Sequence, residues 1–269
     1  MSAWRFRGRQ EGEAADSLWY KAERLPDLEG PIQKRTVFRR WRFFERIINN
    51  KRAENPDEPV RVLDAGCGEG FNLRYLSTAP GVSVFACDMD QERVDRTRQS
   101  FPSVQVAQQD LAAPDYEKGF FDIVILSHVL EQVGDDRAVL AAVRDLLSGN
   151  GVLILVVPNE GCLLAWIRDT FVDKAASRAK NRVRTYNRRR LRRLFRKAGF
   201  SLKRIERENF LFPMPWFHDF FAARKWGFYY MMALNRVLPS QSAGFLVLLE
   251  RAGRESEIAA RLRGIYGRG

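Results

Sequence analysis

Nine residues, 62–70, combine an apolar run, an acid and a glycine-rich turn. The run ends at Asp64, and glycine then occupies every second position, at Gly66, Gly68 and Gly70. Glycine adopts backbone dihedrals closed to other residues and lets the backbone approach a ligand closely. A helical pattern follows from Phe71, and the start of a helix offers free N–H groups with a partial positive charge. The pattern predicts a nucleotide-type cradle at the carboxyl end of a first strand.

The spacing of these glycines favours one class of ligand over another. The dinucleotide-binding fingerprint is G-x-G-x-x-G, whereas this turn is G-x-G-x-G and has Phe71 at the position of the third glycine. Two further acids, Asp88 and Asp110, each follow an apolar or extended run. A carboxylate at Asp88 can accept hydrogen bonds from both hydroxyls of a ribose. The next apolar run, 121–126, leads into Ser127, His128 and Glu131.

This ordered series resembles the class I S-adenosylmethionine (SAM) methyltransferases, especially the branch that includes the ubiquinone and menaquinone methyltransferases. The resemblance covers residues 60–158 well and extends more weakly to Arg251. It implies SAM as the cofactor. The residues that it assigns to SAM binding are Asp64, Gly66, Cys67, Gly68, Gly70, Asp88, Met89, Asp110, Leu111 and Ser127. The family usually has a second histidine where this chain has Gln132, so any role of that histidine is not carried over.

Alternation of short apolar runs with amphipathic segments from Val60 onward indicates a parallel sheet flanked by helices. With the resemblance, we expect an α/β fold: a Rossmann-like, seven-stranded, mostly parallel sheet with helices on both faces. The expected organisation is an N-terminal arm or lid with a helix (1–56), a SAM-binding domain (57–252) and a charged tail (253–269). Acceptor-side insertions are expected at 159–187 and 208–240, the second aromatic-rich and preceding the last strand.

Three residues are candidates for catalysis. His128, at the end of the fourth strand, is either a general base or a ring that packs on the cofactor. Glu131 either orients His128 or lies at the surface. His218 either lines an acceptor pocket or belongs to an ordinary amphipathic helix. No spacing of His, Asp and Glu resembles a metal site.

Composition points to one domain with appendages, because 269 residues with 45% hydrophobic content can bury a substantial core. The three cysteines form neither a disulfide framework nor a zinc-ligand spacing, which suits a reducing cytoplasm. The first nine residues have no following apolar region and so do not predict a signal peptide. The apolar stretch 226–234 is too short to span a bilayer. We therefore expect a cytoplasmic protein.

The net charge of +12 is concentrated in one segment. Residues 174–204 contain 14 Lys and Arg and no Asp or Glu, so the remainder carries 12 − 14 = −2. Three interpretations stay open for this segment: a solvated helix face, a site for an anionic acceptor, or an RNA-binding surface with Tyr186 and Phe195 as stacking groups. Its neighbour, the aromatic insertion, suits an apolar pocket or an interfacial helix, although an ordinary buried helix over 216–237 would also explain it.

Together these features predict a SAM-dependent methyltransferase. The favoured acceptor is an oxygen or nitrogen of a hydrophobic or anionic small molecule, with a lipid-linked acceptor and peripheral association with an anionic membrane as one form of this hypothesis. An RNA methyltransferase and a non-catalytic SAM-binding protein are the alternatives.

Overall fold

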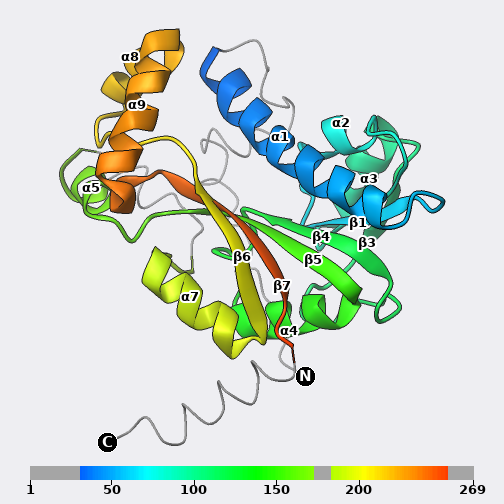
Figure 1. Ribbon diagram of the computed structural model, residues 1–269. Coiled ribbons are helices and arrows are strands. Elements are labelled where there is room, and N and C mark those ends of the chain that lie inside the picture. The colour runs from blue at the N-terminus through cyan, green and yellow to red at the C-terminus, as the bar shows by residue number, and fades with distance from the viewer. Residues whose placement is uncertain (1–30, 173–182, 254–269) are drawn as a thin grey trace, which may run out of the picture.

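A computed structural model of the chain describes residues 31–172 and 183–253 (Figure 1). The predicted arm over 1–30 and the tail from residue 254 therefore lie outside the described residues. So does the part of the basic segment within 173–182.

The described chain forms a seven-stranded sheet in the order β3-β2-β1-β4-β5-β7-β6. The strands are β1 (Val60–Ala65), β2 (Val82–Asp88), β3 (Gln105–Gln108), β4 (Phe121–Ser127), β5 (Leu147–Pro158), β6 (Phe200–Arg207) and β7 (Gly244–Arg251). β7 pairs antiparallel with both β5 and β6, whereas the pairs β3–β2, β2–β1, β1–β4 and β4–β5 are parallel. The predicted fold class, a mostly parallel Rossmann-like sheet, is confirmed.

Helices cover both faces of this sheet, as the sequence predicts (Figure 1). The helices are α1 (Pro31–Glu54), α2 (Leu73–Leu76), α3 (Gln91–Ser100), α4 (Asp136–Leu146), α5 (Leu163–Ile167), α7 (Arg188–Lys197), α8 (Pro215–Ala223) and α9 (Lys225–Val237). A π-helical turn, η1 (Arg168–Val172), and a 3-10 turn, η2 (Pro239–Gln241), complete them.

The alternation of side chains along β5 divides the core into two layers. Leu153, Leu155 and Val157 pack on one side with residues of α4 and α7. Ile154 and Val156 pack on the other side with α1, α2 and α3. Because both sides of a central strand are covered, nearly every position of β5 from Gly151 onward is buried, which explains its unbroken apolar sequence.

The helix that follows the glycine turn, α2, has only one turn, so it supplies little helix dipole to the cradle. Helix α4 ends at Leu146, and the next residue, Leu147, already pairs with Phe121 and opens β5. The first turn of α3 is capped by Asp90 rather than Asp88, which leaves Asp88 for other partners.

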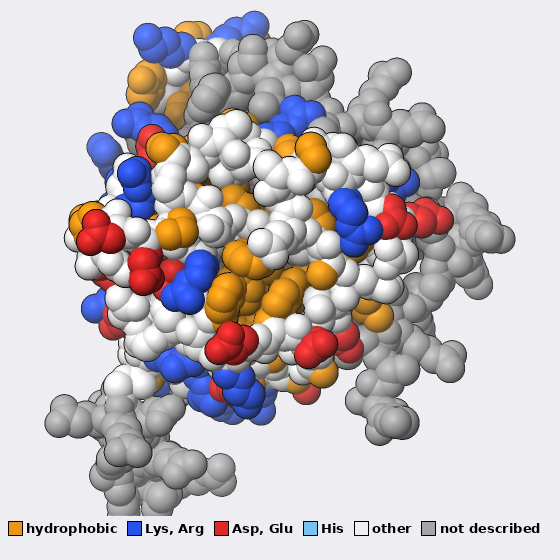
Figure 2. All heavy atoms as spheres, turned by 90° about the vertical axis from the view of Figure 1, so that its right-hand side faces the viewer, with side chains coloured by type: hydrophobic (Ala, Val, Ile, Leu, Met, Phe, Trp, Pro, Cys, Tyr) orange, Lys and Arg blue, Asp and Glu red, His pale blue; other side chains and the backbone are white. Residues whose placement is uncertain are grey.

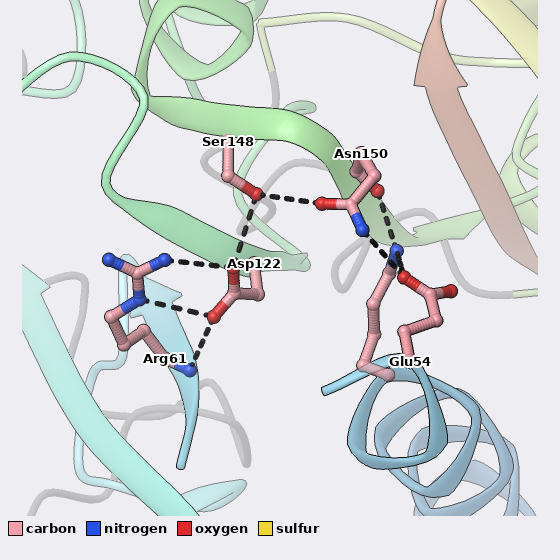
Figure 3. Close-up of polar contacts among 6 residues, drawn as sticks. Glu54, Arg61, Asp122, Ser148 and Asn150 are labelled. Carbon is pink, nitrogen blue, oxygen red and sulfur yellow. Dashed lines mark hydrogen bonds and ion pairs between the residues drawn. The ribbon is translucent and has the colours of Figure 1, made fainter. Parts of the chain in front are cut away.

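The C-terminal end of α1 is fixed to the sheet by a network of polar side chains (Figure 3). Lys51 Nζ donates to Glu54 Oε2 at 2.8 Å and to the carbonyl of Asn150 at 2.6 Å, and Asn150 Nδ2 donates to Glu54 Oε2 at 2.6 Å. On neighbouring strands, Arg61 pairs with Asp122 through both carboxylate oxygens at 3.1 Å. These contacts lie at the amino ends of the strands, so the other half of α1 reaches the carboxyl ends, where the glycine turn lies.

On the side of the molecule that carries β3 and α3, basic and acidic side chains are scattered around a small apolar patch (Figure 2). No single sign of charge dominates there, consistent with the near-neutral remainder of the sequence.

Candidate functional site

The glycine turn after β1 is shaped for close approach of a ligand. Gly68 has φ +55°, and a Cβ built on it would meet no heavy atom within 4 Å, so its backbone faces open space. Gly66 has φ +77°, and a Cβ there would come within 2.5 Å of Val129 Cγ2. One glycine therefore exposes backbone, and the other lets the turn pack against the segment that follows β4.

Asp64, the last-but-one residue of β1, is fully buried beneath this turn. Its Oδ1 accepts a hydrogen bond from Asn72 Nδ2 at 3.0 Å, whereas its Oδ2 has no partner in the described part of the chain. Burial raises the pKa of Asp64 to about 7, and the nearby Asp88 adds to the rise. A buried carboxylate oxygen without a partner is a suitable acceptor for the cationic part of a ligand.

Asp88 ends β2 and is also almost fully buried. Its Oδ2 accepts from the Gly68 backbone N–H at 2.9 Å, and its Oδ1 accepts from the Asp90 backbone N–H at 3.0 Å. Each carboxylate oxygen has a further lone pair, so Asp88 both braces the glycine turn and can accept from a ligand hydroxyl.

The other predicted cofactor residues follow the carboxyl ends of neighbouring strands. Met89 follows β2 and is half-buried, and Ser127 ends β4. Asp110 follows β3 and caps its own turn, accepting from Ala112 N–H at 2.9 Å. Leu111 packs in the core. Their assignment to SAM binding stays a prediction.

Cys67 lies inside the turn and is buried. Burial raises the pKa of its thiol, followed in size by the effect of Asp64. A thiol held neutral is neither a nucleophile nor a metal ligand, so Cys67 is suited to packing within the turn.

A chain of polar side chains lies beside the turn. Glu131 Oε1 is 3.3 Å from Nδ1 of His128, and Nε2 of His128 is 3.2 Å from Nη2 of Arg40. The same Arg40 nitrogen donates to Glu208 Oε1 at 3.0 Å. The structure thus brings His128 and Glu131 together, the first of the two alternatives for Glu131, and adds two residues, Arg40 from α1 and Glu208 directly after β6.

The hydrogen-bond partners of His128 indicate its tautomer. Arg40 can only donate, so Nε2 accepts; Nδ1 then carries the proton and donates to Glu131, an assignment inferred from the partners. His128 also has φ +57°, the one positive value among non-glycine residues of the described ranges. Such backbone strain is sustained only where surrounding contacts fix it, here including the bond from His128 N–H to Val156 O at 2.9 Å.

Arg40 and Glu208 are residues that the sequence analysis did not single out. Burial alone would raise the pKa of Glu208, but Arg40 chiefly, with His128 and Arg39, holds it below its usual range. A signal for Arg40 existed: it lies three residues after Val37 and four before Phe44, both on the apolar stripe of α1. The side chain is buried accordingly.

The aromatic insertion forms helices α8 and α9, which stand beyond the carboxyl end of β6, opposite the N-terminal half of α1 (Figure 1). The alternative of one ordinary buried helix over 216–237 is wrong. Trp216 is 68% exposed, Trp226 57% and Tyr229 62%. His218 lies on α8 and packs against the ring of Phe212, at 6.4 Å between centroids.

The basic segment contributes α7, whose apolar face packs on the sheet as its spacing predicts. Tyr186 and Phe195 are buried, so the hypothesis that they stack on RNA bases is wrong. Tyr186 Oη instead lies 2.8 Å from Asp136 Oδ2 and 3.1 Å from the Leu130 carbonyl. These aromatic groups are structural.

Comparison with known proteins agrees with this geometry. A family model described as "Methyltransferase domain" matches residues 34–204, which is more than half of the chain. This chain belongs to that methyltransferase family. The prediction of a class I methyltransferase with SAM as its cofactor is confirmed at the level of the family.

Relatives of this methyltransferase include a probable S-adenosylmethionine-dependent methyltransferase of Mycobacterium tuberculosis, 32% identical over 135 residues that make up 50% of this chain and 46% of the relative. A malonyl-[acyl-carrier protein] O-methyltransferase of Halalkalibacterium halodurans is 26% identical over 141 residues, 50% of this chain and 51% of the relative. The chain therefore spans about half the length of the curated relatives that it matches.

Solved structures show the same fold. An S-adenosylmethionine-dependent methyltransferase of Mesorhizobium loti superposes with a TM-score of 0.52 and 18% identity, covering 72% of this chain and 92% of that one. A SAM-dependent methyltransferase of Methanosarcina mazei gives a TM-score of 0.51 and 16% identity, covering 73% of this chain and 94% of that one.

Proposed function

We propose that this methyltransferase transfers the methyl group of SAM to an oxygen or nitrogen of a hydrophobic or anionic small molecule. The glycine turn with Asp64 and Asp88 forms the cofactor half of the site. The segment above the carboxyl ends of β4 and β6, with α8 and α9, forms the acceptor half.

The residues present are suited to SAM. The sulfonium of the bound cofactor supplies an activated methyl group for direct displacement. Asp64 would face the cationic amino acid part through its unpartnered Oδ2, and Asp88 would accept from the ribose hydroxyls. The space beside Gly68 is open, so bound SAM could lie against the backbone of the turn there.

The protein's main contribution would be orientation, since the methyl donor is already activated. His128, fixed between Glu131 and Arg40, would form a rigid wall at the carboxyl end of β4. In this tautomer its Nε2 lone pair accepts from Arg40, so proton abstraction at Nε2 would require Arg40 to move. An amine acceptor that is neutral when it attacks would need no base.

The observation that carries the acceptor class is the distribution of exposed apolar side chains. Among the side chains whose burial the structure describes, which begin at Arg39, the large exposed apolar ones belong to α5 and η1 or to the α8–α9–η2 region, with Val183 outside these elements. Exposed aromatic patches of this kind mark apolar ligand or interaction sites. Arg224, Lys225 and Arg236 accompany them.

The same observation favours a lipid-linked acceptor and association with the surface of an anionic membrane. Aromatic side chains with neighbouring cations are the composition of interfacial segments. Across the described ranges, no helix is both long and apolar enough to cross a bilayer.

Transfer of a labelled methyl group tests the proposal. The chain is incubated with SAM labelled at the methyl carbon and with a cell extract that has been separated into lipid, RNA and small polar fractions. We expect label in the lipid fraction or in an apolar anion of the small-molecule fraction, and reduced transfer by Asp88→Ala at a SAM concentration that just saturates the unaltered chain.

Each alternative has its own outcome. Label confined to RNA would support an RNA methyltransferase instead. Tight SAM binding without label in any fraction would support a SAM-binding protein without catalysis. Absence of SAM binding would contradict the cofactor half of the proposal itself.

A further inference from the structure

A groove with a volume of about 620 Å³ runs between α1 and α9. Three arginines of α1 line one side, at positions 39, 42 and 46, and Lys225, Phe228 and Tyr229 of α9 line the other, with Glu206 of β6 between them. The spacing 39, 42, 46 places the arginines on one stripe of α1, beside the stripe that enters the core. Apart from Lys225, the cations that line this groove therefore come from α1.

Positive charge in this groove exceeds the negative charge that faces it. Glu206 accepts from Arg46 at 2.7 Å and also from Arg204 at 2.8 Å, so one carboxylate serves two arginines. Arg42 and Lys225 are exposed and have no ion pair or hydrogen bond within the described residues. Such a surplus attracts anions and is screened by salt.

Arg39 is the most buried of these cations, and its hydrogen-bond partner is a weak one. It is half-buried, and the hydrogen bond of its guanidinium goes to Met232 Sδ at 2.7 Å. A thioether sulfur is a weak acceptor, whereas a guanidinium has five N–H donors that match the oxygens of a phosphate or carboxylate. Burial lowers the pKa of Arg39, with Glu206 and Glu208 opposing this effect and Arg46 adding to it.

The groove adjoins the connected polar side chains of the candidate site, which are Glu131, His128, Arg40 and Glu208. Arg39 is next to Arg40 in sequence and interacts electrostatically with Glu208, the partner of Arg40. A ligand that occupies the groove could thus extend toward His128 and the cofactor half. Phe228 and Tyr229 offer it an aromatic wall.

We propose that the groove between α1 and α9 binds an oxyanion, such as a phosphate group, that is attached to an apolar portion of the methyl acceptor. The inference rests on the proposed function and specifies its acceptor. The anion would lie against Arg39, Arg42 and Lys225, and the apolar portion against Phe228 and Tyr229. The same chemistry can come from a soluble phosphate ester or from a phospholipid headgroup.

Binding of decyl phosphate, below its micelle concentration, tests the groove by calorimetry with the S-adenosylhomocysteine-saturated chain. Decyl glucoside is the uncharged control ligand. We expect decyl phosphate to bind at least about tenfold more tightly, and Arg42→Glu to weaken it roughly five- to tenfold, as for reversal of one exposed charge. The matched control is Arg193→Glu on α7, an exposed position with the same change in net charge, which should stay within about twofold.

Vesicles of phosphatidylcholine with and without phosphatidic acid then distinguish the two sources. If vesicle binding requires phosphatidic acid and is weakened more by Arg42→Glu than by Arg193→Glu, the ligand of the groove is a phospholipid headgroup. If Arg42→Glu weakens binding of decyl phosphate but the chain does not bind these vesicles, the ligand is a soluble phosphate ester. Lys225→Glu repeats the test from the other side. Equal affinity for the two decyl compounds, or equal effects of the α1 and α7 reversals, would overturn the proposal. These readouts need no turnover, so a failed methyl-transfer assay leaves them interpretable.

Discussion

Nη2 of Arg40 lies 3.2 Å from Nε2 of His128, although the two residues are 88 positions apart in sequence. The nitrogen that would act as a general base is therefore engaged by an arginine of the N-terminal helix. The chemistry expected at the end of β4 therefore depends on the position of α1. Whether His128 acts as a general base or only packs against the cofactor can be measured.

His128→Asn should lower turnover by less than about tenfold at saturating SAM. Asn tolerates positive φ better than most residues, so the backbone is kept while the ring is removed. Steady-state rates and SAM affinity are measured together. A loss of a hundredfold or more with unchanged SAM affinity would contradict this expectation and restore the role of a general base.

Asp88→Ala should weaken binding of SAM and of its demethylated product by on the order of 1.5–3 kcal/mol, the effect of losing a charged hydrogen bond. Calorimetry measures the change. Asp95→Ala, on the solvent-facing side of α3, is the matched control and should bind normally. Unchanged affinity in the Asp88 variant would sink the ribose assignment.

Stability of the ligand-free chain should fall as the pH rises toward 7, relative to Asp64→Asn. The folded-state pKa of Asp64, about 7, lies above its unfolded value near 3.9. The contribution of the protonated carboxyl is complete below about pH 4 and is lost as the pH rises to the folded pKa. Urea denaturation from pH 5 to 8 should show a relative loss on the order of 2–4 kcal/mol. Parallel pH profiles of the two proteins would argue against a protonated Asp64.

Arg40→Met should destabilise the fold by about 3–5 kcal/mol, because it leaves the Glu208 carboxylate buried without its cation. Adding Glu208→Gln in the same chain should recover part of this loss. Denaturation of the two single variants and the double variant gives the coupling. If the double variant is no more stable than Arg40→Met, the ion pair is not what the two residues share.

Trp226→Ser should weaken association with phosphatidylglycerol vesicles roughly three- to tenfold, since apolar insertion of the exposed indole is lost. Co-sedimentation with vesicles measures it. Val183→Ser removes an equally exposed apolar group outside the α8–α9 insertion and should have little effect. If the protein does not bind these vesicles at all, the proposed membrane association is wrong, and a soluble small molecule remains as the proposed methyl acceptor.

The fold was largely predictable, because its signals are local. The apolar run that ends at Asp64 lies in β1, the apolar run 121–126 lies in β4, and the glycine turn marked the carboxyl end of β1. The partnership of Arg40 with Glu208 was not predictable in this way. The two residues are 168 positions apart, and the residues near each of them in sequence carry no signal that identifies its partner in the ion pair. The same holds for Asn72, whose amide meets Asp64 only after the turn has folded.

Glu208 stands at the root of the insertion, between β6 and the α8–α9 pair, and its partner is on α1. The strands that bracket the insertion, β6 and β7, pair with one another through their own backbone, so the segment between them could be exchanged for that of a relative without disturbing the sheet. A chimaera that imports residues 209–243 would keep the ion pair, whereas one that imports 208–243 would also have to import the matching residue at position 40. A change of acceptor specificity would then involve two segments that are far apart in sequence, the insertion with position 208 and position 40 on α1, and these would have to change together.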